Sequence, residues 1–286
     1  LGILVPPSIN LIIYGLLTDT SVPELYLAGI FPGITLALLF MAVIVVACLW
    51  RPTFDGDKIK TTWESRIKVL PDLLPPVLLF MAVVGSIYAG VATPTEAASI
   101  GVCFALLIAA WNKALNIRML KEAFEGTMRS TAMIMLIILA AVFLNFVLGF
   151  MGVTQTILEA IKELGWTPMQ TMIVIICFYL LLGMFMETLS MMLTTIPVVF
   201  PIVVYLGFDP VWFGIMITVL MEAALITPPI GINLYVVHGI RARGGKFNDV
   251  SIGAVPFLFG MFFLIAILLF FPDIATWLPQ QVYHPG

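Results

Sequence analysis

Long apolar runs separated by short polar loops dominate the hydrophobic pattern of the chain. A helix that crosses a bilayer needs about 20 apolar residues, because each residue adds about 1.5 Å against a hydrocarbon core about 30 Å thick. The pattern therefore predicts an all-α polytopic membrane protein. Its predicted apolar segments are 1–17, 25–50, 70–91, 95–112, 131–150, 170–207, 211–240 and 250–272.

The composition agrees with this class and excludes others. Hydrophobic residues make up 62% of the 286 and charged residues 10%, which leaves no room for a large soluble domain. The sequence has no nucleotide-binding, hydrolase or zinc-protease motif and no basic stripe, so neither an enzyme nor a nucleic-acid-binding protein is predicted. The three cysteines and two histidines lie too far apart to predict a transition-metal site.

The basic residues predict the orientation of the spans. They cluster in three loops, whereas the loops 18–24, 90–96 and 207–210 have none and 151–169 has only Lys162. Loops rich in Lys and Arg stay on the cytoplasmic side, so these three loops are predicted to be cytoplasmic. They hold Arg51, Lys58, Lys60, Arg66 and Lys68 in the loop 51–69, then Lys113, Arg118, Lys121 and Arg129, and finally Arg241, Arg243 and Lys246.

The segment 170–207 is too long for one span and is interrupted by polar residues and prolines. The segment 131–150 runs outward and the third basic loop lies inside, so an odd number of crossings must separate them. A re-entrant hairpin that enters from outside and turns near Thr188–Ser190 satisfies this count, as would two short full spans. We favour the hairpin, because polar backbone at membrane depth is tolerated where protein encloses it.

Three further segments carry local helix signals. Residues 115–130 place apolar and basic positions at helical spacing, which predicts an amphipathic helix on the cytoplasmic surface, and 154–166 predicts a similar helix on the outer side. In TPTEAAS, Thr93 is predicted to cap a helix whose first and third residues are Pro94 and Glu96.

Two proline pairs, in VPPSIN and TPPIGIN, interrupt apolar segments. Pro6–Pro7 and Pro228–Pro229 remove amide donors, so neither helix can close its hydrogen-bond ladder. The carbonyls freed just before each pair need partners in a medium without water, and a sodium ion is a suitable one. These carbonyls are predicted around Leu4, Val5, Ile226 and Thr227. Simple proline kinks are the alternative interpretation.

Polar residues follow each proline pair. The half-helix that begins there presents its positive end, which suits a carboxylate. Ser8, Asn10 and Asn233 add a hydroxyl and two amides, and Gly231 allows close approach of the backbone.

The two proline pairs belong to a repeated pattern. Gly15 matches Gly239 and Pro32 matches Pro256 at one constant offset. Within each copy, a broken span is followed by a short loop and a long apolar span. The loop after the first copy is acidic and that after the second is basic, so the copies are predicted to be inverted relative to each other. Inverted repeats place transporter sites near the membrane midplane, on discontinuous helices.

At these residues the chain resembles the large membrane subunit of tripartite ATP-independent periplasmic (TRAP) transporters. The matching motifs are VPPSINLIIYG, ATPTEAASIGV, GMFMETLS with PVVFPI, and ITPPIGINLYVV. The resemblance implies sodium-driven, elevator-type import of a small organic acid. It also implies a periplasmic binding protein and a small membrane subunit as partners, and the inner membrane of a bacterium or archaeon as the location.

The resemblance also implies two sites, each made by a hairpin and a broken helix. For sodium, the first would use Val5, Pro6 and Ser8, and the second Gly183, Glu187, Thr188, Ser190, Thr227, Pro228 and Gly231. Substrate would contact Ser8, Asn10, Thr194, Thr195 and Asn233. The family often has Asp where this chain has Glu187, so that carboxylate is expected either to contact the ion or to satisfy amides at the hairpin tip. Glu222 is expected to serve in hydrogen bonding or in ion coupling.

These expectations define the predicted organisation. Residues 1–50 would end the first repeat, 51–69 would be a cytoplasmic loop, and 70–272 would form the second repeat, with scaffold helices over 70–150. Residues 273–286 would be a periplasmic tail. Because the sequence begins with Leu inside an apolar segment, it is expected to be the C-terminal part of a longer protein whose first hairpin lies upstream.

Two rival functions remain. A sodium–carboxylate symporter of the same architecture would work without a binding protein. A proton-translocating subunit of a respiratory complex would need intramembrane chains of Lys and Glu, and no confident span contains Lys or Arg.

Overall fold

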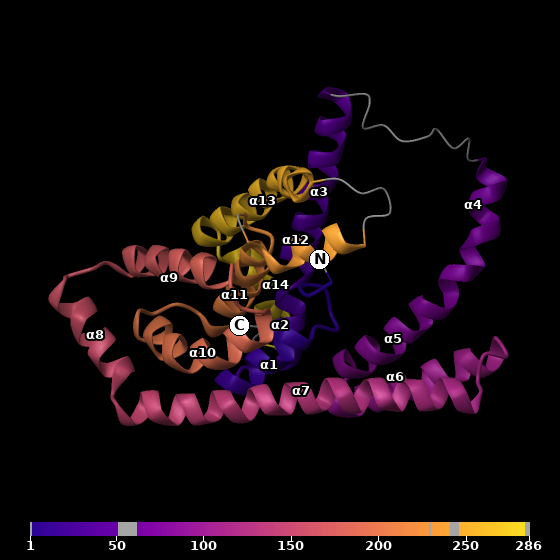
Figure 1. The fold of residues 1–286 in the computed structure, drawn as a ribbon, viewed down its shortest axis with the longest axis horizontal. Helices are drawn as coiled ribbons and strands as arrows, with labels where there is room; N and C mark the ends of the chain where they lie inside the picture. The colour runs from indigo at the N-terminus through magenta and orange to yellow at the C-terminus, as the bar shows by residue number, and fades with distance from the viewer. Residues whose placement is uncertain (1, 51–61, 229, 241–245, 284–286) are drawn as a thin grey trace. The chain divides into compact units, whose positions relative to one another are not determined.

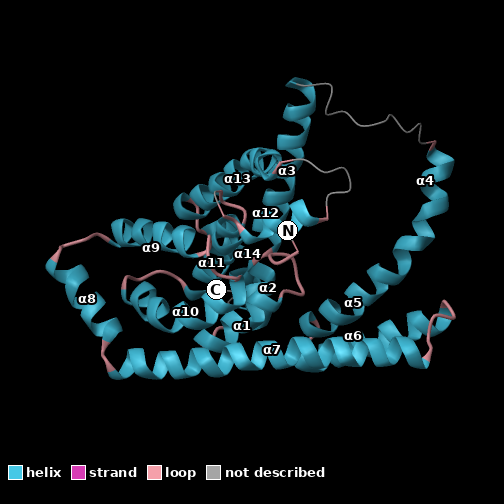
Figure 2. Ribbon diagram, viewed as in Figure 1, coloured by secondary structure: helices cyan, strands magenta, loops and turns pink. Residues whose placement is uncertain are grey.

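The computed structural model describes residues 2–50, 62–228, 230–240 and 246–283. The described residues form helices and loops without strands, as Figure 2 shows. The chain divides into two compact units, residues 1–45 with 136–286, and residues 46–135. The predicted all-α polytopic class is confirmed: the described residues include six helical segments that are long and apolar enough to cross a membrane. These are Val22–Trp50, Ile67–Tyr88, Pro94–Trp111, Ile117–Phe150, Thr188–Tyr205 and Phe247–Phe270.

The smaller unit, 46–135, is built from consecutive helices (Figure 1). α5 packs against α6, whose start has the predicted capping box: Thr93 Oγ1 accepts from the Glu96 amide, and the Glu96 carboxylate accepts from the Thr93 amide at 2.8 Å. The elements are α4 (Trp63–Val69), the 3-10 turn η2 (Leu70–Leu73), α5 (Leu74–Tyr88), α6 (Pro94–Trp111) and the first part of α7 (Ile117–Phe150).

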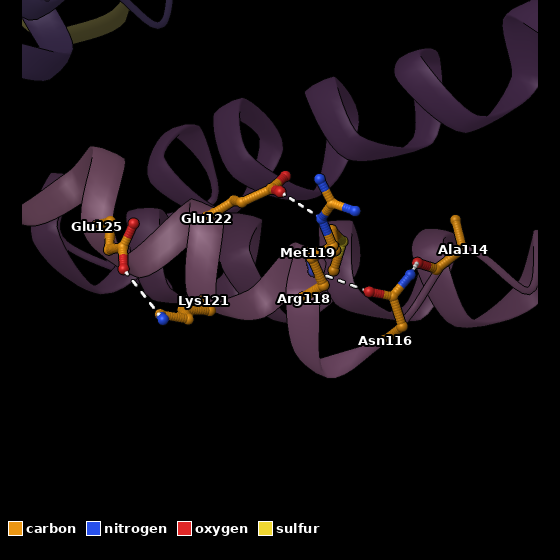
Figure 3. A network of polar contacts seen from close by, with 7 residues as sticks. All are labelled: Ala114, Asn116, Arg118, Met119, Lys121, Glu122 and Glu125. Carbon is orange, nitrogen blue, oxygen red and sulfur yellow. Dashed lines mark hydrogen bonds and ion pairs between the residues drawn. The ribbon is translucent and has the colours of Figure 1, made fainter.

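The long helix α7 corrects one prediction. The amphipathic segment 115–130 and the span 131–150 were expected to be separate, but one uninterrupted helix contains both. No Pro or Gly stands at their junction, and two exposed ion pairs, Arg118–Glu122 at 2.9 Å and Lys121–Glu125 at 3.7 Å, link successive turns (Figure 3). Its 34 residues extend to about 51 Å, well beyond the hydrocarbon core.

The larger unit contains the remaining helices. The helix after the first proline pair has ten residues, too few to cross a bilayer by itself, and most of the predicted tail 273–286 is helical. The elements are α1 (Ile9–Thr18), α2 (Val22–Ala28), α3 (Ile30–Trp50), α8 (Val153–Glu163), α9 (Pro168–Leu182), α10 (Thr188–Tyr205), α11 (Pro210–Leu225), α12 (Ile232–Gly239), α13 (Phe247–Phe270) and α14 (Asp273–Tyr283).

Helix α11 forms the core of this unit. It packs against α1, α2, α9, α10, α13 and α14, and from Trp212 to Leu225 every residue except Glu222 is buried. Such all-round burial is typical of a helix that is apolar on every face. Two hydrogen bonds hold it in place: Tyr14 Oη donates to the Pro210 carbonyl at 2.7 Å, and Trp212 Nε1 donates to the Leu268 carbonyl at 2.7 Å.

The Trp212 bond compensates for a proline. Leu268 lies four residues before Pro272, which has no N–H to offer to the Leu268 carbonyl. The indole N–H of α11 takes its place in a buried setting. A carbonyl that one helix cannot satisfy is thus used to fix a neighbouring helix.

The packing of α11 on α1 requires Gly214. A Cβ at this position would lie 2.6 Å from the Tyr14 ring and 2.7 Å from the Leu25 side chain. We predict that Gly214→Ala lowers the free energy of unfolding by about 1–3 kcal/mol, as overpacking of a core does. Thermal unfolding of the purified protein in detergent measures the change.

Gly126→Ala is the matched control, because among the described residues nothing lies within 4 Å of its added Cβ. This exposed helical substitution is expected to be neutral or stabilising by roughly 0.5–1 kcal/mol. Equal melting temperatures for Gly214→Ala and the unsubstituted protein would contradict the packing described.

Candidate ion and substrate site

Helices α9 and α10 are separated by the break 183–187. The end of α9 is fixed by the Gly183 amide, which donates to the Tyr179 carbonyl at 2.9 Å. Tyr179 also joins the two helices, since its hydroxyl lies 2.7 Å from Thr195 Oγ1. The break therefore lies between two helices that share a polar contact, as a hairpin tip requires, while the re-entrant path through the membrane stays a prediction.

Glu187 is the N-cap of α10. Its carboxylate accepts hydrogen bonds from the Leu189 amide at 3.0 Å, the Ser190 amide at 3.2 Å and the Ser190 hydroxyl at 3.3 Å. A negative charge at a helix N-terminus is favoured by the exposed amides and by the helix dipole. Of the two roles expected for Glu187, satisfying the amides of the hairpin tip is the one that its contacts display.

The hairpin tip meets the second broken helix at Gly183. A Cβ on Gly183 would lie well inside 3.0 Å of the Ala224 Cβ, a separation that real carbon atoms do not adopt. Ala224 lies in the last turn of α11, three residues before Thr227. The glycine thus allows the hairpin and the end of α11 to touch, and Gly183 is the predicted ion-binding residue that makes this contact.

The end of α11 presents backbone oxygens at this place. The Ala223 carbonyl accepts from the Ile226 amide at 3.3 Å and from Thr227 Oγ1 at 2.7 Å, and the Ala224 carbonyl accepts from the Thr227 amide at 3.1 Å. Within the described part of the chain no donor reaches the Leu225 carbonyl. In a regular helix it would accept from residue 229, which is a proline.

The sequence predicts freed carbonyls around Ile226 and Thr227, and in the described part of the chain no donor reaches either of them. The Leu225 carbonyl is freed as well and lies just outside this prediction. Counting four residues back from Pro229 would have found it. The chain then turns through Gly231, whose φ of +47° is a conformation that glycine adopts without strain. Its Cα lies close to the same carbonyl, because a Cβ there would be 3.0 Å from the Leu225 oxygen. Pro228 lies in the turn before it, and Pro229 is outside the described residues.

The first break has a similar local design at the start of α1. Ser8 is the N-cap, and its Oγ accepts from the Leu11 amide at 3.4 Å. Pro6 and Ser8 are buried, whereas Val5 is exposed. The Leu4 carbonyl lies against the junction of α2 and α3, where a Cβ on Gly29 would approach it to 2.5 Å. This close approach of backbone to backbone explains a glycine between the two helices.

Asn10 is the least satisfied polar group at this end of α1. Its side chain is only 5% exposed, and its Nδ2 has no hydrogen-bond partner among the described residues. An unpaired amide donor in an apolar interior costs about 1–3 kcal/mol, so its presence points to a missing acceptor. A ligand oxygen, such as a carboxylate at the positive end of α1, fits this donor.

The other predicted substrate residues are not brought together. Thr194 Oγ1 donates to the Ser190 carbonyl at 2.8 Å, and Thr195 is held by Tyr179 and the Met191 carbonyl. Asn233 instead lines a cavity of about 510 Å³ between α12 and α13, to which no hairpin residue contributes. The same cavity receives Asp249, whose charge would repel a carboxylate.

Two further residues, Glu222 and Tyr179, belong to neither the predicted sodium-binding nor the predicted substrate-binding residues. Glu222, expected to act in hydrogen bonding or ion coupling, lies on α11 with a buried Oε1 that has no hydrogen-bond partner among the described residues. Tyr179, which sequence reasoning missed, fixes the hairpin through Thr195. No polar pattern marks Tyr179 in the sequence, because it is one aromatic residue within an apolar helix.

The chain is a polytopic helical membrane protein with helix breaks before α1 and after α11 and a polar hairpin tip between α9 and α10. This is the architecture of secondary transporters. The family model described as "Tripartite ATP-independent periplasmic transporter, DctM component" matches residues 1–274. The chain belongs to this family of TRAP large permease subunits, which confirms the resemblance noted in the sequence. It is accordingly an inner-membrane protein with a role in transport rather than catalysis.

Characterised relatives cover the whole chain. It is 32% identical to a C4-dicarboxylate TRAP transporter large permease protein of Vibrio cholerae, covering 100% of this chain and 67% of the relative. It is 29% identical to the sialic acid permease of the same organism, covering 98% and 65%, and 32% identical to the ectoine permease of Halomonas elongata, covering 99% and 66%. The chain thus spans about two thirds of the length of these relatives.

The contact between hairpin and α11 can be tested by exchanging its two residues. We predict that Gly183→Ala lowers the rate of substrate uptake about tenfold, because overpacking by about 1–3 kcal/mol separates the tip from α11. Ala224→Gly removes the opposing methyl group, so the double substitution Gly183→Ala/Ala224→Gly should recover most of the rate. Uptake into proteoliposomes measures both. A double variant no better than Gly183→Ala would contradict the contact.

Proposed function

We propose that this chain couples the inward movement of sodium ions to the uptake of a small organic acid. The observation that supports this most strongly is the meeting of two helix breaks at Gly183 and Ala224, beside the unpaired carbonyl of Leu225. In a medium without water a freed carbonyl needs a cation or a donor. Sodium is bound in this way by unwound backbone in transporters with broken helices.

The second sodium site would use the Leu225 carbonyl and the oxygens of the hairpin tip. Thr227, Thr188 and Ser190 supply hydroxyl groups close to the two breaks. Glu187 would stabilise the tip through its three hydrogen bonds and place negative charge near the ion. Gly183, Pro228 and Gly231 would shape the backbone around the ion. Val5, Pro6 and Ser8 would serve the first site.

The substrate would be bound through a carboxylate. The relatives are named for C4-dicarboxylate, sialic acid and ectoine, which share a carboxylate group. The positive end of α1 and the unpaired Nδ2 of Asn10 offer donors to such a group. A small TRAP membrane subunit and a periplasmic binding protein would complete the system. Transport would follow an elevator-type movement of the segments that pack around α11.

Uptake in a reconstituted system tests the coupling. Proteoliposomes would contain the permease and the small membrane subunit, with a labelled dicarboxylate, sialic acid or ectoine offered outside. The binding protein and an inward sodium gradient are each added or omitted. We expect uptake to require both. Uptake driven by sodium without the binding protein would indicate the simpler symporter, and uptake indifferent to sodium would contradict the ion site.

Two substitutions separate the roles of the ion-site residues. Thr227→Ala removes the hydroxyl that donates to the Ala223 carbonyl at the end of α11, and we expect it to raise the sodium concentration for half-maximal uptake about tenfold. Glu187→Gln keeps one acceptor oxygen for the helix cap but removes the second acceptor and the charge, so it should lower the melting temperature only slightly while weakening sodium dependence. Full retention of sodium dependence in Glu187→Gln would restrict Glu187 to the structural role.

Asn10 is tested by separating stability from activity. Asn10→Leu removes a buried, unpaired donor and keeps the branched shape of the side chain, so we expect the free energy of unfolding to rise by about 1 kcal/mol while uptake is lost. Ile9→Leu, at an exposed neighbouring position, should change neither quantity. Thermal unfolding and uptake on the same preparations measure both effects. An Asn10→Leu variant that transports normally would remove Asn10 from the substrate site.

A further inference from the structure

Helix α10, which begins at the hairpin tip, contains two prolines, Pro197 and Pro201. Pro197 has no N–H, so the carbonyl of Leu193, four residues earlier, loses its regular helical donor. Leu193 is buried, with 5% of its surface exposed, and water is not available to replace that donor in a membrane interior. A neighbouring group has to satisfy this carbonyl.

The replacement donor comes from another helix. Asn145, near the end of α7, donates its Nδ2 hydrogen to the Leu193 carbonyl at 3.0 Å. Its Oδ1 is buried and has no hydrogen-bond partner among the described residues. The described contacts therefore orient this amide through one bond only, the bond to α10. An asparagine that served solubility would instead turn its amide to solvent.

The fold uses the same device elsewhere, as Trp212 donates to the Leu268 carbonyl that Pro272 leaves without a donor. There the bond joins two helices of a closely packed core. At Asn145 the surrounding residues of α7 are mostly exposed, so apolar packing does little to fix α7 against α10. The polar bond then decides the register of the two helices.

We propose that Asn145 is a positioning residue for transport: it receives the carbonyl released by Pro197 and so holds the hairpin arm α10 at a fixed place on α7. The arm starts at Glu187 and includes Thr188 and Ser190, so its placement sets the position of the proposed ion-binding oxygens. In this respect the inference rests on the proposed function. The bond from Asn145 to the Leu193 carbonyl therefore depends on Pro197. With any other residue at 197, the amide of that residue would donate to the Leu193 carbonyl, and Asn145 would lose its acceptor.

Substitutions of Asn145 and Pro197 distinguish two roles for Asn145: holding α10 in position on α7, or only donating a hydrogen bond to the Leu193 carbonyl. Asn145→Leu removes the donor and leaves the Leu193 carbonyl unpaired, so both thermal stability and uptake rate should fall, the latter about tenfold. In Asn145→Leu/Pro197→Ala the new alanine supplies its own N–H to Leu193. Stability should then return, whereas uptake should stay low because α10 is still not tied to α7. Phe143→Leu, at an exposed position of α7, is the control for both measurements and should alter neither.

A distance measurement provides a readout that does not depend on transport. Spin labels at the exposed positions Phe146 on α7 and Val204 on α10 report the spread of separations between the two helices. We expect a narrow distribution in the otherwise unsubstituted protein and a broad one in both Asn145→Leu and the double variant.

The outcomes are decisive in either direction. Recovery of uptake together with stability in the double variant would show that Asn145 only satisfies a carbonyl, and would overturn the positioning role. Unchanged uptake or an unchanged distance distribution in Asn145→Leu would overturn it as well. If the unsubstituted protein showed no sodium dependence, the proposed ion coupling would fail, but the distances would still test the tie between α7 and α10.

Discussion

The structure depends on one constraint: every backbone carbonyl and amide inside the membrane needs a partner from the protein or from a ligand. Prolines release carbonyls at defined places along the chain, and at two of these places a side chain of a neighbouring helix donates to the freed carbonyl. Trp212 binds the carbonyl of Leu268, and Asn145 binds that of Leu193. The carbonyl of Leu225 has no donor in the described part of the chain, and it lies where two helix breaks meet.

This contrast connects architecture to function. Where a side chain satisfies a freed carbonyl, two helices become fixed to each other. Where no side chain does, we propose that the carbonyl binds a cation. Gly231 lets another backbone segment come close to the Leu225 carbonyl, and Gly183 lets the hairpin touch the neighbouring Ala224. The same argument applies to donors, because the Nδ2 of Asn10 at the start of α1 is buried and has no hydrogen-bond partner among the described residues. Unsatisfied groups of opposite polarity therefore mark the proposed ion and substrate sites.

Much of the fold could be predicted from the sequence, since long apolar runs and helix caps are local signals. The capping box at Thr93 was predicted in this way, whereas the turn expected near Thr188–Ser190 lies at 183–187, just before α10 begins. The length of α7 was missed because a change from amphipathic to apolar pattern was taken as a boundary, although nothing in the chain ends the helix there. The sequence prediction assigned no secondary structure to the tail, although Pro272 and Asp273 are typical of a helix start.

The candidate site was less predictable for a physical reason. Broken helices could be located from the prolines, but α11 is apolar on all faces, so its sequence does not show which side meets the hairpin. The contact of Gly183 with Ala224, the bond from Asn145 and the cavity beside Asn233 all depend on tertiary packing.

Hydrogen–deuterium exchange with and without sodium tests the central claim most directly, that freed backbone groups at the two breaks bind the ion. Sodium, compared with potassium at equal ionic strength, should slow amide exchange in peptides covering 183–190 and 226–233, and it should leave α5 and α6 unchanged. Equal exchange at these breaks in both salts would contradict the account.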